Sequence, residues 1–229
     1  MSEPGEVRTP YLVLRKTEYS ETSLVLAGIT PESGRLHFLA RGARRLGRRR
    51  FPVVDLFRVL EVVYRPGRGE LQTWRSVALH TDYSGLGHRY DAYCTAVWLA
   101  RFALGNVMPN VPHPRFFRAM LCALQRLLDD TAPRSARLAA ARLGPALVFL
   151  DENGSLPVAS DHSVAARTRT LLGMAVGTEP VPALTPQNWE RLWGWLVLLL
   201  RQGECRLPAT EPTASAAAGR AARNDPDPG

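Results

Sequence analysis

Residues 40–51 concentrate the side chains of this chain that are best suited to bind phosphate. The stretch is ARGARRLGRRRF, and six of its twelve residues are arginine: Arg41, Arg44, Arg45, Arg48, Arg49 and Arg50. A guanidinium group presents a planar fork of N–H donors that matches phosphate oxygens, and each phosphate contact releases condensed counterions. Gly42 and Gly47 leave the backbone free to approach a ligand closely. The pattern predicts a segment that binds polyanions, and the alternative is a solvated loop without a specific ligand.

The positive charge of the whole chain is concentrated in the same region. The 229 residues carry a formal net charge of +8 and include a single lysine. Residues 1–80 hold 14 basic and 8 acidic side chains, a net charge of +6, whereas residues 81–229 hold 15 and 13, a net charge of +2. A basic balance of this kind indicates an acidic partner, either nucleic acid or an anionic membrane surface.

Short β-strands are the elements expected to position the arginine-rich segment. Five apolar or alternating runs have turn residues between them and no helical period: residues 11–16, 23–30, 36–42, 57–65 and 70–80. Five strands within about 70 residues favour a small barrel or a sandwich. The segment then lies between the third and fourth strands, as a loop on a rigid scaffold, where binding residues are frequent.

Further basic and aromatic residues lie on the predicted strands and turns. A basic groove on a small barrel can follow a nucleic-acid backbone, and aromatic rings beside it can stack on bases. The additional basic candidates are Arg15, Lys16, Arg35, Arg65 and Arg68. The candidate stacking residues are Phe38, Phe51, Tyr64 and Trp74, for each of which burial in the core is the alternative.

From about residue 82 the apolar period becomes helical. Helices are predicted near residues 90–98, 114–128, 134–150, 163–174 and 185–200. The last of them, with Thr185 as N-cap, is apolar almost all round, which is typical of a central helix. The sequence thus predicts three parts: a nucleic-acid-binding domain (1–80), a helical domain (81–207) and a disordered tail rich in proline and alanine (208–229).

Several classes of protein have little support in the sequence. Motifs of phosphate-binding loops, serine hydrolases and metalloproteases are absent, and the paired carboxylates lie at predicted helix ends, so we expect no enzyme. Three separated cysteines predict neither a disulfide framework nor a zinc site, and we expect no cofactor. The longest apolar run, residues 195–200, is too short to span a membrane. A soluble, cytoplasmic protein is expected.

Two stretches resemble one known family. Residues 19–45, YSETSLVLAGITPESGRLHFLARGARR, resemble the N-terminal signature of the RecO family of bacterial DNA recombination and repair mediators, and residues 64–77 resemble its closing hairpin. The resemblance implies an α+β protein, with a five-stranded OB-fold barrel followed by an all-α helical domain. It implies binding of single- and double-stranded DNA, annealing of complementary strands and help in loading RecA. The implied partners are RecR, RecA and the acidic C-terminal tail of the single-strand DNA-binding protein.

The resemblance also implies a protein-binding site and exposes one departure. In similar proteins the acidic tail binds a basic residue near the start of the third helix, beside an apolar pocket. The matching stretch is residues 133–144, where Arg137, Leu138 and Arg142 are the candidates, and the alternative is that the arginines only face solvent. Many members carry a four-cysteine zinc site that residues 151–162 lack, so no zinc is expected. A protein-interaction scaffold and an RNA-binding protein remain alternative functions.

Overall fold

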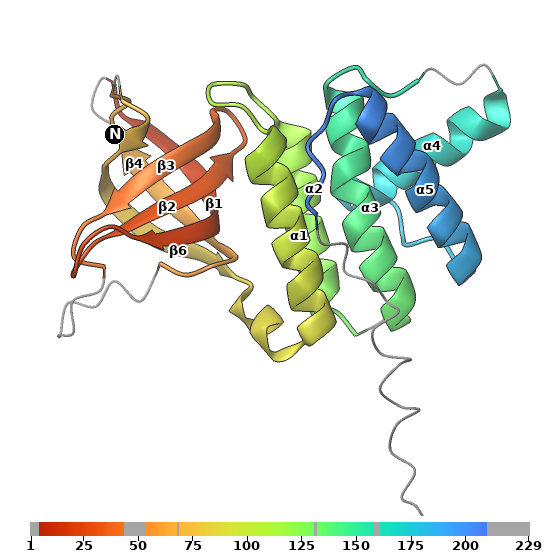
Figure 1. The fold of residues 1–229 in the computed structure, drawn as a ribbon, viewed down its shortest axis with the longest axis horizontal. Helices are drawn as coiled ribbons and strands as arrows, with labels where there is room; N and C mark the ends of the chain where they lie inside the picture. Colours follow the sequence, from red (N-terminus) through yellow and green to blue (C-terminus); the bar gives the residue numbers. More distant parts are fainter. Residues whose placement is uncertain (1–4, 44–53, 68, 131, 158–160, 210–229) are drawn as a thin grey trace, which may run out of the picture.

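The computed structural model describes residues 5–43, 54–67, 69–130, 132–157 and 161–209. A β-sheet forms one end of the molecule and helices form the other (Figure 1), which confirms the predicted α+β class. The strands are β1 (Val7–Glu18), β2 (Leu24–Thr30), β3 (Gly34–Ala40), β4 (Arg58–Tyr64), β5 (Leu71–Gln72) and β6 (Trp74–Asp82). The helices are η1 (Ser84–His88), α1 (Tyr90–Asn106), α2 (Pro114–Leu128), α3 (Arg134–Glu152), α4 (His162–Val176) and α5 (Pro186–Gln202).

The predicted five-stranded OB-fold barrel is not confirmed. The sheet has six strands in the order β5-β3-β2-β1-β4-β6, and in the described part of the chain no ladder joins β5 to β6. The strand expected at residues 70–80 is interrupted at Thr73, so that β5 pairs with β3 while β6 pairs with β4. The β4–β6 ladder shifts its register between Val63 and Tyr64, where Arg75 of β6 is skipped two residues after this break, and such irregularities bend a strand. One short segment therefore supplies both edges of an open sheet.

The inner face of the curved sheet carries its own core of apolar side chains. Along β3, buried and partly exposed residues alternate, so that Leu36, Phe38 and Ala40 point inward. The ring of Phe38 lies edge-on to Tyr11 and Tyr64, with centroid distances of 4.9 and 5.2 Å. Edge-to-face packing of this kind stabilises a core beyond the buried area. Phe38 and Tyr64 are fully or almost fully buried, so they are core residues and not the predicted stacking residues.

In the helical part, α3 and not α5 is the central helix. Ten residues of α3 between Ala140 and Leu150 are buried, and α1, α2, α4 and α5 all pack against this helix. The prediction that α5 is central was wrong, because Trp195 and Leu198 are 37% and 59% exposed. Thr185 does cap α5, since its hydroxyl accepts a hydrogen bond from the Asn188 N–H at 3.3 Å. None of the described helices has the length and apolar character needed to cross a membrane.

A turn between β2 and β3 joins the sheet to the helices. Backbone N–H groups of the α1–α2 loop donate from His113 to Pro31 O and from Asn110 to Ser33 O, both at 2.9 Å. Gly34 adopts a left-handed φ of +62° in this turn. A continuous core also crosses the junction, from Leu12 and Ile29 on the sheet into the helices. Hydrogen bonds and buried apolar contacts thus fix the sheet against the helices.

Candidate nucleic-acid and partner-binding sites

The outward residues of β3 form a row that continues onto the neighbouring strands. Arg35, His37 and Leu39 alternate with the buried residues of β3, and Arg41 follows one step beyond the strand. Residues paired across strands lie on the same face of a sheet. Arg15 of β1 and His37 of β3 are both paired with Ala27 of β2, so they belong to one row across the sheet. We call the surface formed by Arg15, Arg35, His37, Leu39 and Arg41 the outer track.

His37 lies among the cations of the outer track, and they affect its protonation. Partial burial, and then the charges of Arg35 and Arg15, lower the pKa of His37 below its ordinary value of 6.5, while Glu70 acts in the opposite direction. Like charges near a histidine disfavour its protonated form. His37 is therefore a neutral residue at pH 7 that can gain a charge when an anion binds beside it.

The predicted basic residues of the sheet differ in their contacts and in their exposure. Lys16 forms an ion pair with Asp55, and Arg35 donates from its guanidinium to the carbonyl oxygen of Leu104 at 2.7 Å. Arg65 follows β4 at the end of β1 opposite to the β1–β2 turn, because Tyr64 pairs with Val7. Arg15 and Arg41 have exposed side chains on the outer track. Arg44, Arg45, Arg48, Arg49, Arg50, Arg68 and Phe51 lie outside the described residues, so their roles stay predictions.

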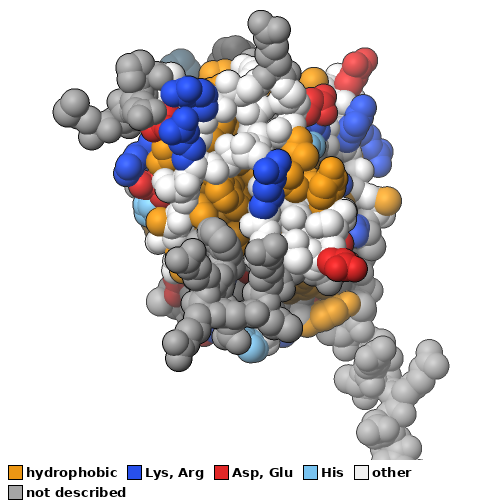
Figure 2. All heavy atoms as spheres, turned by 90° about the vertical axis from the view of Figure 1, so that its left-hand side faces the viewer, with side chains coloured by type: hydrophobic (Ala, Val, Ile, Leu, Met, Phe, Trp, Pro, Cys, Tyr) orange, Lys and Arg blue, Asp and Glu red, His pale blue; other side chains and the backbone are white. Residues whose placement is uncertain are grey.

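Figure 2 views the molecule from the end formed by the sheet. The lysine and arginine side chains described on this face gather near its two sides, with one near the centre, and hydrophobic and uncharged atoms lie between these groups. The described part of this face is therefore mixed in character. A binding surface here would use apolar as well as ionic contacts.

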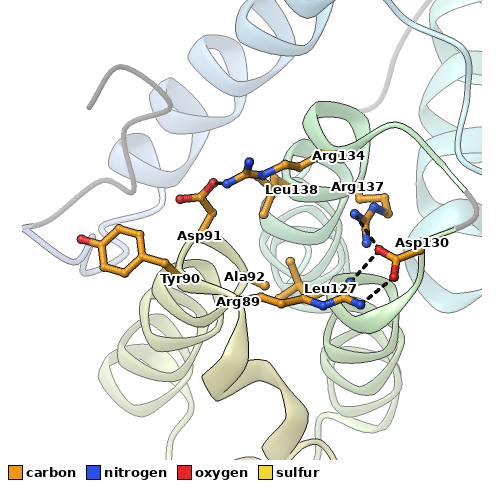
Figure 3. A pocket seen from close by; sticks show the side chains of 9 residues that line it. All are labelled: Arg89, Tyr90, Asp91, Ala92, Leu127, Asp130, Arg134, Arg137 and Leu138. Carbon is orange, nitrogen blue, oxygen red and sulfur yellow. Dashed lines mark hydrogen bonds and ion pairs between the residues drawn. The ribbon is translucent and has the colours of Figure 1, made fainter. Parts of the chain in front are cut away.

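A second candidate site lies where α1, α2 and α3 meet (Figure 3). Arg137 and Leu138 line a pocket of about 300 Å³, together with Leu127 of α2 and with Arg89 and Tyr90 at the start of α1. Arg142 does not line this pocket, because its guanidinium lies over the ring of Trp193, 4.0 Å from the ring centroid. The structure thus brings together two of the three predicted partner-binding residues. It places the third on the α3–α5 contact.

Asp130 occupies the cationic side of this pocket. The Arg89 guanidinium donates two parallel hydrogen bonds to the Asp130 carboxylate at 2.7 and 2.6 Å, and Arg137 lies 3.3 Å from the same group. The hydrogen bond from Arg89 holds the pKa of Asp130 below its ordinary value. Arg134 is ion-paired with Asp91 on the same rim. A carboxylate is therefore already bound between two guanidinium groups, beside the apolar side chains of Leu127 and Leu138.

Comparison with known proteins gives consistent results over both parts of the chain. The family model "Recombination protein O N terminal" matches residues 1–83. A DNA repair protein RecO of Methylococcus capsulatus is 30% identical over 177 residues, which are 75% of this chain and 69% of the relative. This chain belongs to the RecO family. The RecO protein of Variovorax paradoxus is 28% identical over 200 residues, 82% of this chain and 76% of that protein. For the RecO protein of an Anaeromyxobacter species, 30% identical over 139 residues, the alignment covers 54% of the relative's length.

Membership of the RecO family indicates a role in DNA repair and recombination, and it gives the signature turn a structural meaning. Within the turn, Glu32 accepts a hydrogen bond from the Thr9 hydroxyl at 2.8 Å, Ser33 O accepts from the α1–α2 loop, and Gly34 makes the bend. Ser33 and Gly34 therefore hold the sheet against the helices, whereas Glu32 ties the turn to β1 of the same sheet. In the described part of the RecO chain, no group of three or more His, Cys, Asp or Glu side chains could hold a metal.

Sequence reasoning missed four residues that the structure places at these two sites. His37 could have been found, because it lies two residues from Arg35 in a strand and so shares its face. Tyr19, an exposed aromatic residue in the turn after β1, lies beside Leu39 and Arg41 of the outer track, and it has no sequence signal beyond its position before Glu21-Thr22-Ser23. Arg89 and Asp130 reach the Arg137 pocket from distant segments, which only the packing of helices can reveal.

Proposed function

We propose that this RecO protein is a mediator that binds single- and double-stranded DNA, anneals complementary strands and assists RecA loading onto DNA coated with single-strand DNA-binding protein. The observation that carries the proposal is the outer track, which continues at Arg41 into the arginine-rich segment of the sequence. Annealing needs no catalytic residue. Two strands must be brought together while their phosphate repulsion is screened, and guanidinium groups supply that screening.

The helical pocket supports a second part of the proposal, which concerns the protein partner. An acidic C-terminal tail carries carboxylates and apolar side chains, and the pocket offers Arg89 and Arg137 for the first and Leu127 and Leu138 for the second. The pair with Asp130 gives the geometry of a carboxylate bound there. We therefore place the tail of the single-strand DNA-binding protein in this pocket, and we include RecR and RecA as partners on the family resemblance.

The decisive experiment measures annealing and DNA affinity together. Complementary oligonucleotides coated with their single-strand DNA-binding protein should anneal faster in the presence of this chain. Replacement of Arg44, Arg45, Arg48, Arg49 and Arg50 by alanine should reduce affinity for single-stranded DNA. The slope of log affinity against log salt should also fall, by about 0.7 for each lost phosphate contact.

A matched control separates a defined surface from general charge. Arg167 and Arg169 on α4 and Arg191 and Arg201 on α5 are exposed arginines away from the sheet, and their replacement removes a similar charge. The salt slope of this control should stay near that of the wild type. Equal loss in both variants contradicts the proposal. So does a wild-type affinity no better than a generic electrostatic Kd of about 10⁻⁴–10⁻⁶ M, which fits a protein-interaction scaffold instead.

A further inference from the structure

A hollow lies at the end of the outer track, where the β1–β2 turn meets the end of β3. Its volume is about 460 Å³. Six residues line it: Tyr19, Thr22, Ser23, Leu39, Arg41 and Gly42. The lining thus combines an aromatic ring, two hydroxyl groups, an apolar side chain and a guanidinium group. A nucleotide presents the complementary groups, namely a flat base, polar base edges and a phosphate.

Tyr19 is presented to this hollow by a well-defined turn. Its backbone N–H donates to Ser23 O at 3.1 Å, and the N–H groups of Ser20 and Ser23 donate to Ser23 O and Ser20 O at 3.3 and 3.4 Å. The residue is nevertheless 64% exposed, which leaves its ring open to a ligand. A fixed backbone with an exposed ring lowers the conformational entropy lost on binding. The position is therefore suited to stacking.

The other aromatic side chains described on the sheet are not open in this way. Phe38 and Tyr64 are buried, and Trp74 packs at 5.5 Å from Phe38 with an interplanar angle of 31°. Arg41 is exposed on the rim of the same hollow as Tyr19 and begins the arginine-rich segment. The ring and the cation of the hollow are thus in reach of one ligand.

We infer that this hollow binds one unpaired nucleotide of single-stranded DNA, with its base stacked on Tyr19 and its phosphate bound by Arg41. This inference rests on the proposed DNA-binding function and deepens it. In a duplex the faces of the bases are covered by their neighbours, so a duplex can use the guanidinium groups but not the tyrosine. Tyr19 is thereby the residue that separates single-stranded from double-stranded DNA, whereas the arginines bind both.

The test compares three variants on two DNA ligands at fixed low salt. Tyr19→Ala should weaken binding of a 20-nucleotide thymidine strand roughly 5- to 100-fold, the range that removal of one base–aromatic stack produces. Its affinity for a duplex of equal length should match that of the wild type. Tyr19→Phe keeps the ring and should bind the single strand as the wild type does. Trp195→Ala, which removes an exposed aromatic residue on α5, should change neither affinity.

A second ligand checks that the base itself is the group bound. A strand of the same length with abasic sites should bind the wild type about as weakly as the thymidine strand binds Tyr19→Ala, and the variant should bind both strands equally. Equal losses on single strand and duplex, or no loss with Tyr19→Ala, overturn the nucleotide site while the DNA-binding function stands. Failure of the wild type to bind either DNA overturns the proposed function itself.

Discussion

Gly34 is the residue at which one added methyl group should most directly disturb the junction between sheet and helices. Its φ of +62° lies in the left-handed region, where an L-residue with a side chain loses about 1–2 kcal/mol. A Cβ placed there would lie 2.3 Å from Met108 O and 2.5 Å from Val111 O, distances that no real side chain tolerates. Gly34→Ala must therefore push the β2–β3 turn away from the α1–α2 loop.

The magnitude follows from the bonds that this movement breaks. The turn and the loop are joined by backbone hydrogen bonds at Asn110, His113 and Arg35, with lengths of 2.9, 2.9 and 3.3 Å. Each backbone hydrogen bond contributes about 0.5–1.5 kcal/mol net. Loss of two of them, added to the conformational cost, gives a destabilisation of about 2–5 kcal/mol.

Gly154 provides a matched control within the same chain. Its φ is +68°, close to that of Gly34, but an added Cβ would have no heavy atom within 4 Å. Gly154→Ala should therefore cost only the conformational term of about 1–2 kcal/mol. Urea unfolding followed by tryptophan fluorescence measures both variants, and the shared core predicts one cooperative transition. Equal destabilisation of the two variants would refute the reasoning, because the junction contacts would then contribute nothing.

Three further predictions concern the pocket, the outer track and the α3–α5 contact. Asp130→Asn should tighten binding of an acidic C-terminal peptide about three- to tenfold in an anisotropy titration, because it removes the carboxylate that occupies Arg89 and Arg137 in the free protein. Asp129→Asn removes the same charge outside the pocket lining, so it should leave peptide affinity unchanged. Affinity for single-stranded DNA should rise about two- to fivefold from pH 8 to pH 6 as His37 protonates beside phosphate, and His37→Gln should flatten this dependence. The stability of the free protein should change in the opposite direction, falling from pH 8 to pH 6. Because the pKa of His37 is lower in the folded than in the unfolded state, its contribution to stability is present above pH 6.5 and is lost as the pH falls through the folded-state pKa. Arg142→Met should lower the free energy of unfolding by about 0.5–1 kcal/mol through loss of the cation–π contact with Trp193, and urea denaturation measures this.

Local sequence patterns predicted where most strands lie, but they wrongly predicted that the sheet closes into a barrel. The alternation from Gly34 to Ala40 identifies both faces of β3, because the period of a strand is fixed at two residues. The division at Thr73 has no such local signal. The division arises because residues 71–72, before the break, pair with β3, whereas residues 74–82, after it, pair with β4. Register is a property of two segments, so one segment's sequence underdetermines it.

The same limit explains the results for the helices and the pocket. The sequence predicts α5 as a central helix because Trp195 and Leu198 widen its apolar face, but α3 has the longer buried run and takes that place. For the pocket, the family resemblance implied Arg137, Leu138 and Arg142 alike. The first two line it, whereas Arg142 lies over Trp193 of α5. Spacing along one helix defines a face, and the packing of other helices decides what that face contacts.

The β2–β3 turn joins the sheet, which carries the outer track, to the helices, which carry the Arg137 pocket, so it sets how the two candidate binding sites lie relative to each other. The outer track begins at Arg35, whose guanidinium donates to the carbonyl oxygen of Leu104 near the C-terminal end of α1. The Arg137 pocket includes Tyr90, at the N-terminal end of the same helix. Below its melting temperature, Gly34→Ala should still bind a short DNA strand and an acidic peptide separately, because neither site contains Gly34. In the proposed mechanism, annealing of protein-coated strands requires both contacts in one geometry, so the annealing rate should fall more than either affinity does. Unchanged annealing by a folded Gly34→Ala protein would show that the two surfaces act independently.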